Sequence, residues 1–155
     1  KTKSAAEALQ SLMRLCARGE RSTGDAMRLM RTWGVPEGER QSVVDRLVAQ
    51  RFIDNSRYAE LYVREKSCLS GWGARKIAMQ LRAKGVEKEV IAEALATIDR
   101  DEQGDRLAEK LRRKMRTTKA QSDYEMRGKL LRYALGLGYD YDDANTALDK
   151  IMAER

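Results

Sequence analysis

The chain has 155 residues, a formal charge of +7 and an isoelectric point near 9.5. A hydrophobic content of 42% excludes a disordered chain, and an aromatic content of only 6% disfavours a β-sandwich. Histidine is absent, which removes the usual general base at neutral pH and the commonest metal ligand, so an enzyme is the less favoured class.

Apolar residues recur at helical spacing from the start of the chain. Ser4 with Glu7, and Ser22 with Asp25, fit the capping pattern that opens a helix. The first three apolar stripes are Ala8, Leu9, Leu12, Met13 and Cys16, then Ala26, Leu29, Met30 and Trp33, then Val43, Val44, Leu47 and Val48.

Six further helices follow a break around Asp54. Gly104 stands near the start of the seventh helix, and Ser122 with Glu125 fits the cap of the eighth. The helices are marked by Tyr58, Leu61 and Tyr62, by Ala74, Ile77, Ala78 and Leu81, by Val90, Ile91, Ala94, Leu95 and Ile98, by Leu107, Leu111 and Met115, by Met126, Leu130, Tyr133 and Leu137, and by Ala144, Ala147, Leu148, Ile151 and Met152. No segment alternates with a period of two, so the sequence predicts an all-α fold.

Three glycines mark a repeat. Gly34, Gly85 and Gly138 each follow an apolar helical stretch and each precede an apolar residue, at intervals of 51 and 53 residues. A glycine at this place can adopt the left-handed conformation that ends a helix. The spacing predicts three tandem three-helix repeats, over residues 1–52, 53–98 and 99–155, that stack into an elongated, curved body.

Basic residues are concentrated in one region of the chain. Residues 105–135 carry a charge of +6, whereas residues 136–155 carry −3. The candidate partner-binding or nucleic-acid-binding residues are Arg106, Lys110, Arg112, Arg113, Lys114, Arg116, Lys119, Arg127, Lys129 and Arg132. They form either a footprint for a polyanion or a solvated face that keeps the protein soluble.

A second candidate is the turn Gly71-Trp72-Gly73, which Arg75 and Lys76 follow at a predicted helix start. The free N–H groups of a helix start bind anions, and Trp72 could stack on a base or on a partner side chain. Alternatively, the glycines only make a tight turn between helices and Trp72 packs over it.

No pattern in the sequence indicates an active site, a cofactor or a metal. Cys16 and Cys68 are expected to be small core residues, and their number favours a reducing compartment. The acidic pairs Asp142–Asp143 and Glu37–Glu39 fit helix starts, where they complement the helix dipole. The chain has no apolar run of membrane-spanning length and does not begin as a signal peptide does, and the missing initial methionine leads us to expect residues before Lys1.

Several motifs together resemble the RecX regulatory proteins. They are Asp54-Asn-Ser-Arg57-Tyr58-Ala59, Gly71-Trp-Gly73, Ile77, Leu81, Lys84-Gly85-Val86, Ala94-Leu95, and Lys129-Leu-Leu-Arg132-Tyr133 through Gly138-Tyr139. The resemblance covers residues 4–154 and is most specific over residues 52–98.

The resemblance implies a cytoplasmic bacterial modulator of the RecA recombinase, active in DNA recombination, DNA repair and the SOS response. Such proteins bind the RecA–DNA filament and limit its growth, strand exchange and ATPase activity, and we expect a monomer. Two other functions stay open on the residues alone: a general nucleic-acid-binding protein that uses the basic surface of residues 105–132, and an enzyme acting on nucleic acid.

Overall fold

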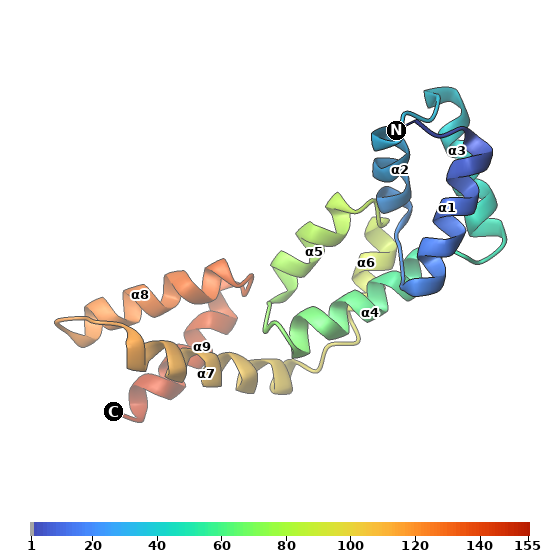
Figure 1. The fold of residues 1–155 in the computed structure, drawn as a ribbon. Coiled ribbons are helices and arrows are strands. Elements are labelled where there is room, and N and C mark those ends of the chain that lie inside the picture. Colours follow the sequence, from blue (N-terminus) through green and yellow to red (C-terminus); the bar gives the residue numbers. More distant parts are fainter. Residues whose placement is uncertain (1) are drawn as a thin grey trace. The chain divides into compact units, whose positions relative to one another are not determined.

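A computed structural model describes residues 2–155, which form helices and no strand (Figure 1). The all-α prediction is confirmed. The helices are α1 (Ala5–Arg18), α2 (Thr23–Thr32), α3 (Glu37–Ala49), α4 (Asn55–Cys68), α5 (Ala74–Ala83), α6 (Lys88–Leu95), α7 (Arg100–Thr117), α8 (Asp123–Gly136) and α9 (Tyr141–Ala153).

The described chain packs into two compact units. One contains the residues up to Leu61 together with Gln80–Ala94, and the other contains Tyr62–Met79 together with Leu95–Arg155. The division therefore runs through α4, α5 and the end of α6, so that the middle group of three helices contributes to both units. The block boundaries expected at 52/53 and 98/99 stay a prediction.

Local capping explains where several helices begin. The capping boxes of Ser4 with Glu7 and of Ser22 with Asp25 are both present, and the Ser122 side chain accepts a hydrogen bond from the Glu125 N–H. Helix α7 begins at Arg100 behind the cap residue Asp99 and continues through Gly104, where a Cβ atom would meet only open space.

The three predicted helix stops have the same backbone geometry. Gly34, Gly85 and Gly138 have φ angles of 70°, 80° and 99°, in the left-handed region that favours glycine. The N–H of the following residue bonds the carbonyl oxygen five residues earlier in all three turns: Val35 to Met30 at 3.0 Å, Val86 to Leu81 at 3.1 Å, and Tyr139 to Ala134 at 3.3 Å. This pattern is the glycine helix stop that the sequence predicts, and the three following side chains are buried.

Each of these turns also receives a backbone hydrogen bond from an earlier part of the chain. The acceptor is always the carbonyl oxygen of the residue just before the glycine, and we call this bond the turn contact. The donors and acceptors are Lys3 N–H to Trp33 at 2.8 Å, Gly24 N–H to Lys84 at 3.0 Å, and Gly73 N–H to Leu137 at 2.7 Å. A Cβ atom on Gly24 or Gly73 would collide with the backbone of the turn it contacts, so both positions require glycine.

Each unit has its own apolar core. The core of the first unit is formed by α1, α2 and α3, and its largest fully buried side chains are Leu12, Met30, Leu47, Ile53 and Val35. The core of the second unit is formed by α7, α8 and α9 around Leu107, Leu111, Leu130, Leu148 and Ile151. Figure 1 shows these last three helices side by side.

The two cysteines differ in their surroundings. Cys16 is half-buried and packs against the core of the first unit, whereas Cys68 is exposed. The prediction that Cys68 fills a core is wrong, because it is the last residue of α4 and the neighbouring Ser67 takes the buried side.

Leu81 is fully buried on α5, as its place in the apolar stripe predicts. Replacing it with alanine should destabilise the protein by about 2–5 kcal/mol, because the removed methyl groups leave a cavity that the surroundings fill only in part. Thermal denaturation followed by circular dichroism measures this effect. An unchanged melting temperature for Leu81→Ala would show that the surroundings collapse fully onto the smaller side chain.

Candidate functional site

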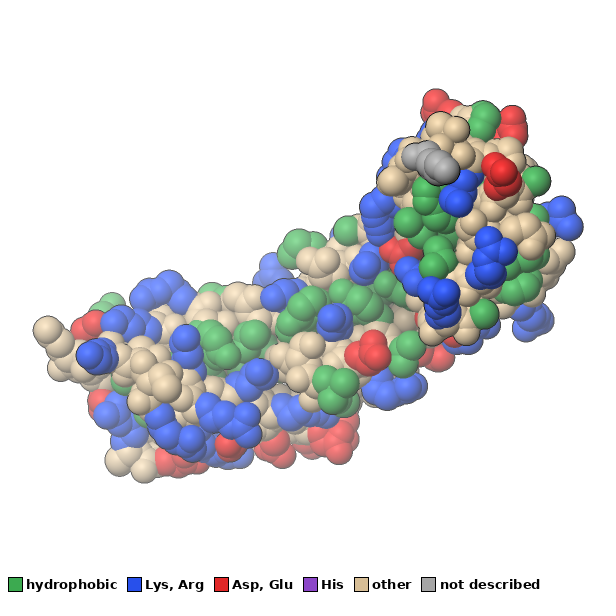
Figure 2. Space-filling model, viewed as in Figure 1, with side chains coloured by type: hydrophobic (Ala, Val, Ile, Leu, Met, Phe, Trp, Pro, Cys, Tyr) green, Lys and Arg blue, Asp and Glu red, His purple; other side chains and the backbone are tan. Residues whose placement is uncertain are grey.

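All the basic residues singled out in the sequence lie in the second unit, on α5, on α7, on the loop after α7 and on α8. Figure 2 shows Lys and Arg side chains gathered over α7, with acidic side chains along the lower edge of the same region. The two signs of charge therefore lie close together, and the ion pairs between them decide which cations remain available to a partner.

The acidic residues of α9 and its end neutralise one side of α7. The Arg112 guanidinium donates to both carboxylate oxygens of Glu154, from Nε at 2.9 Å and from Nη2 at 2.8 Å, and Nη1 lies 3.3 Å from Glu109. These bonds raise the pKa of Arg112 and lower the pKa of Glu154. Arg112 therefore fixes the end of the chain against α7, and its charge is balanced within the protein.

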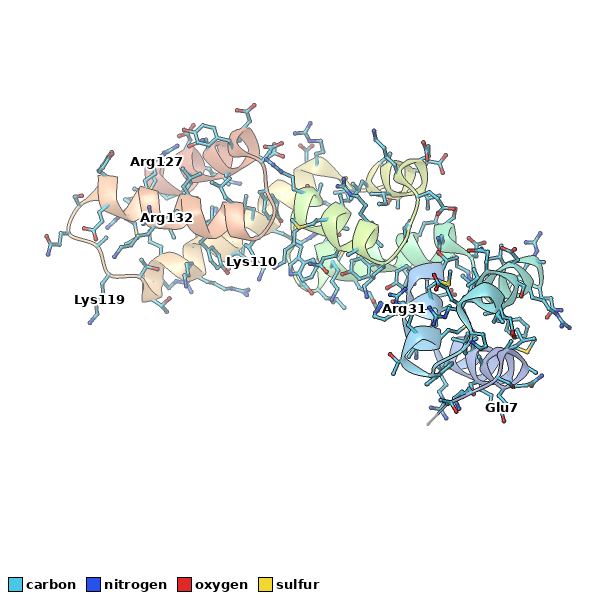
Figure 3. The ribbon with its side chains drawn as sticks, turned by 90° about the horizontal axis from the view of Figure 1, so that it is seen from above. Glu7, Arg31, Lys110, Lys119, Arg127 and Arg132 are labelled. Carbon is cyan, nitrogen blue, oxygen red and sulfur yellow. The ribbon has the colours of Figure 1, made fainter. Side chains whose placement is uncertain are left out.

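Arg127 on α8 is held in the same way. Its Nη2 atom donates to the Asn145 side-chain oxygen at 2.9 Å and to Asp149 at 2.8 Å, both on α9. Figure 3 shows Arg127 on the α9 side of α8, whereas Lys119 extends from the α7–α8 loop away from the helices. The predicted basic cluster is thus divided between two sides of the unit.

The other side carries a surface that we call the α7–α8 basic face, formed by Lys110, Arg113, Lys114, Lys119, Lys129 and Arg132 around Tyr133. Lys110, Arg113, Lys114 and Thr117 follow one another at helical spacing on α7 and, with Tyr133, line an open hollow of about 230 Å³. The Lys114 ammonium lies 5.0 Å from the centre of the Tyr133 ring. Lys129 donates to the Lys119 carbonyl oxygen at 2.6 Å and ties the loop to α8.

Only part of this face is neutralised. Arg113 pairs with Glu109 at 3.3 Å, and Lys129 pairs with Glu125 at 3.1 Å. Within residues 2–155, no ion pair to a carboxylate is formed by Lys110, Lys114, Lys119 or Arg132. The α7–α8 basic face therefore presents a net positive surface, which attracts anionic partners.

The two remaining α7 candidates have different surroundings. Arg106 pairs with Glu102 at 3.6 Å, and its Nη1 atom is buried without a hydrogen-bond partner, so this guanidinium points partly into the protein. Arg116 is exposed one turn beyond Arg112. Neither belongs to the α7–α8 basic face.

The residues before α5 form a tight turn between helices, which is one of the two interpretations of the Gly71-Trp72-Gly73 motif. Gly71 has a φ angle of +72°, and Gly73 packs directly on the backbone of Gly138. The Arg75 N–H donates to the Gly138 carbonyl oxygen at 3.0 Å. The Arg75 N–H is therefore bonded to the third helix stop and is not free for an anion. The Arg75 side chain itself is exposed.

Lys110 connects the two groups of candidate residues, the turn before α5 and the α7–α8 basic face. The carbon atoms of its side chain pack over Gly71, where an added Cβ atom would collide with them. Lys110 also lines the hollow beside Tyr133. Lys76 lies on the other flank of the turn, with its ammonium 4.3 Å from the centre of the Trp72 ring. The turn and the α7–α8 basic face thus form one continuous surface within the second unit.

Lys66 also belongs to this surface, although it is not among the candidate residues that the charge pattern of the sequence indicates. Its ammonium lies 4.8 Å from the centre of the Trp72 ring and 5.4 Å from that of Tyr62. A signal was present, because Lys66 follows Tyr62 by four residues and therefore shares its helix face.

Tyr139 connects the third helix stop to the turn before α5. Its hydroxyl donates to the Gly71 carbonyl oxygen at 3.2 Å, and burial raises the pKa of Tyr139 from 10.0 to about 12. The native state therefore keeps a proton that the unfolded chain releases above pH 10, so this contribution to stability falls as the pH rises through that range.

Near neutral pH the parent should be more stable than Tyr139→Phe by about 0.5–1.5 kcal/mol, because the variant lacks the hydrogen bond. This difference should shrink as the pH rises from about 10 toward about 12. Urea denaturation of both proteins across this range measures the difference. A difference that stays constant would show that the hydroxyl is not buried in this bond.

The part of the chain that the structure describes contains no group of three Cys, Asp or Glu side chains placed to hold a metal ion. No helix among residues 2–155 combines the length and the apolar character that crossing a membrane requires.

Two family models match this chain: the second three-helix domain of RecX matches residues 54–95, and the third matches residues 101–148. The regulatory protein RecX of Mycobacterium avium is 33% identical over 122 residues, covering 78% of this chain and 69% of that protein. The regulatory protein RecX of Mycolicibacterium vanbaalenii is 31% identical, covering 99% of this chain and 85% of that protein. The chain belongs to the RecX family.

Solved RecX structures have the same fold. A crystal structure of a regulatory protein RecX superposes with a TM-score of 0.86 at 21% identity, over 94% of this chain and 73% of that one. RecX from Lactobacillus salivarius gives a TM-score of 0.78 at 22% identity, over 96% of this chain and 97% of that one. The chain is therefore a RecX-family regulatory protein built from tandem three-helix domains.

Proposed function

We propose that this chain is a negative modulator of the RecA recombinase that binds the RecA–DNA filament and limits its growth, strand exchange and ATPase activity. Membership of a family of regulatory proteins supports a role of this kind. The protein acts by binding, as a monomer in the cytoplasm, and catalyses no reaction of its own.

The observation that carries the proposal is the unequal neutralisation of the second unit. Arg112 and Arg127 are paired with acidic residues around α9, whereas Lys110 and Lys114 have no carboxylate partner among the described residues. Cations that are kept apart from the protein's own acids are available to phosphates and to acidic side chains of a partner. A filament of protein and DNA offers both.

A general nucleic-acid-binding protein is the second candidate function. The same cations favour it, and so does the half-buried Trp72 beside them, because aromatic rings interleaved with basic residues are typical of nucleic-acid surfaces. The two functions differ in what they require of the partner: the first needs the recombinase on the DNA, and the second needs DNA alone.

Sedimentation separates the two. The protein is mixed in parallel with preformed recombinase filaments, with free recombinase and with naked single-stranded DNA, and the pelleted fraction is measured. We expect strong co-sedimentation with filaments and inhibition of their ATPase activity. Equal binding to naked DNA, with a steep salt dependence and no inhibition, would favour the general nucleic-acid-binding protein.

A further inference from the structure

The indole of Trp72 lies close to two lysines that form no ion pair among residues 2–155. Lys66 reaches it from α4 and Lys76 from α5, with their ammonium groups 4.8 Å and 4.3 Å from the ring centre. The Tyr62 ring meets the indole edge-to-face, with 6.4 Å between the ring centres. This cluster lies entirely within the second unit.

The charges of this cluster are not balanced. Within residues 2–155, neither Lys66 nor Lys76 forms an ion pair with a carboxylate, and Lys110 packs its stem over the adjacent Gly71 without one. All three lysines are half-buried. Partly desolvated ammonium groups held together raise the local positive potential, and an anion that binds among them relieves it.

The ligand must also suit an aromatic ring. Trp72 is half-buried, so part of its side chain remains exposed to solvent beside the two lysines. An inorganic phosphate or an acidic peptide would satisfy the charge but leave this apolar surface exposed. A nucleotide supplies both parts, because its phosphate pairs with lysine and its base covers the ring.

The base must be unpaired. In a duplex the faces of the bases are stacked on one another, whereas a single strand can present a base to an aromatic side chain. We propose that Trp72, Lys66, Lys76 and Lys110 form a contact site for single-stranded nucleic acid, with a base against the indole and the neighbouring phosphates on the lysines. The inference rests on the proposed function in one respect: the single strand that we name is the DNA strand bound in the recombinase filament.

Lys110 extends the site toward the α7–α8 basic face. It borders both Gly71 and the hollow at Tyr133, where Lys114 again lies over an aromatic ring, at 5.0 Å. An aromatic ring with a lysine over it therefore lies on either side of Lys110. Phosphates along a strand meet basic groups at both places.

The test uses the full chain without any recombinase. The protein has two tryptophans, so Trp33→Phe leaves Trp72 as the only one. A single-stranded oligothymidylate should quench the Trp72 fluorescence, because a base stacks on the indole. Polyphosphate and poly-glutamate matched to it in charge should leave the fluorescence unchanged. Quenching by poly-glutamate instead would overturn the proposal in favour of an acidic protein partner.

Affinity provides the second measurement. Fluorescence anisotropy with a labelled oligothymidylate should show that Trp72→Ala weakens binding about tenfold or more, the loss typical of one stacked base. Lys76→Ala should lower the salt slope by about one. Lys3→Ala is the matched control, because Lys3 lies 5.1 Å from the Trp33 ring in the first unit, and it should bind as the parent does. Parental affinity of Trp72→Ala would overturn the proposal.

The inference and the proposed function can fail separately. Inhibition of the recombinase ATPase by a protein that does not bind oligothymidylate would leave the proposed function standing and refute the strand contact. Binding of oligothymidylate through Trp72 without any inhibition would refute the proposed function and leave the strand contact standing.

Discussion

Reversing the charge of the α7–α8 basic face at three positions, by Lys110→Glu, Arg113→Glu and Lys114→Glu, should abolish binding to the recombinase filament at low salt. The reversal removes attraction and adds repulsion against phosphates and acidic side chains. Arg112 is left unchanged, because a glutamate there would face Glu109 and Glu154 and would disturb the packing of α9. Inhibition of the recombinase ATPase at about 50 mM and about 200 mM salt measures the effect.

Two further variants make this result specific. The first is a triple variant, Lys110→Gln with Arg113→Gln and Lys114→Gln, which removes the attraction without adding repulsion. It should lower the salt slope of filament binding by about three, one for each lost phosphate contact. The matched control reverses three exposed cations of the first unit, Arg14, Arg46 and Lys88, and should inhibit as the parent does. A folded reversal variant that inhibits as strongly as the parent would place the contacts elsewhere.

Gly73→Ala should destabilise the second unit strongly. The added Cβ would lie 2.5 Å from the Gly138 carbonyl carbon and oxygen and from the Tyr139 nitrogen. These are backbone atoms, so either α5 or the third helix stop must move, at a cost of about 1–3 kcal/mol. The melting temperature should fall by about 2–4 °C for each kcal/mol.

Gly104→Ala is the matched control for this substitution. Gly104 lies inside α7, and its Cβ position has no atom within 4 Å. Alanine favours a helix interior over glycine, so this variant should gain about 0.5–1 kcal/mol. Equal melting temperatures for Gly73→Ala and the parent would contradict the close contact between Gly73 and the third helix stop.

The features that sequence predicts well here are local ones. The caps at Ser4, Ser22 and Ser122 and the stops at Gly34 and Gly85 depend on residues within about one or two helical turns, so the pattern along the chain contains the information that fixes them. Even so, helical periodicity placed Cys68 in a core, because a periodic pattern does not show where the neighbouring helices end.

The arrangement of the basic residues depends on contacts between distant segments. Arg112 and Glu154 are 42 residues apart, and Lys110 meets Gly71 across 39 residues, so neither contact is visible from residue spacing. A partial signal was the negative charge of residues 136–155, which predicts that α9 neutralises part of its surroundings. The sequence therefore locates the candidate cations, and tertiary packing decides which of them face a partner.

The turn contacts have a consequence for how the chain can change in length. Both partners of each bond are backbone groups. Two of these contacts, made by Gly24 and Gly73, join one block to the next, and each requires little of the sequence besides the donor glycine. A duplicated stretch of some fifty residues brings its own glycine stop and its own glycine donor, so a new block can attach to an existing one without compensating substitutions. The number of modules in such a chain is therefore free to vary by tandem duplication.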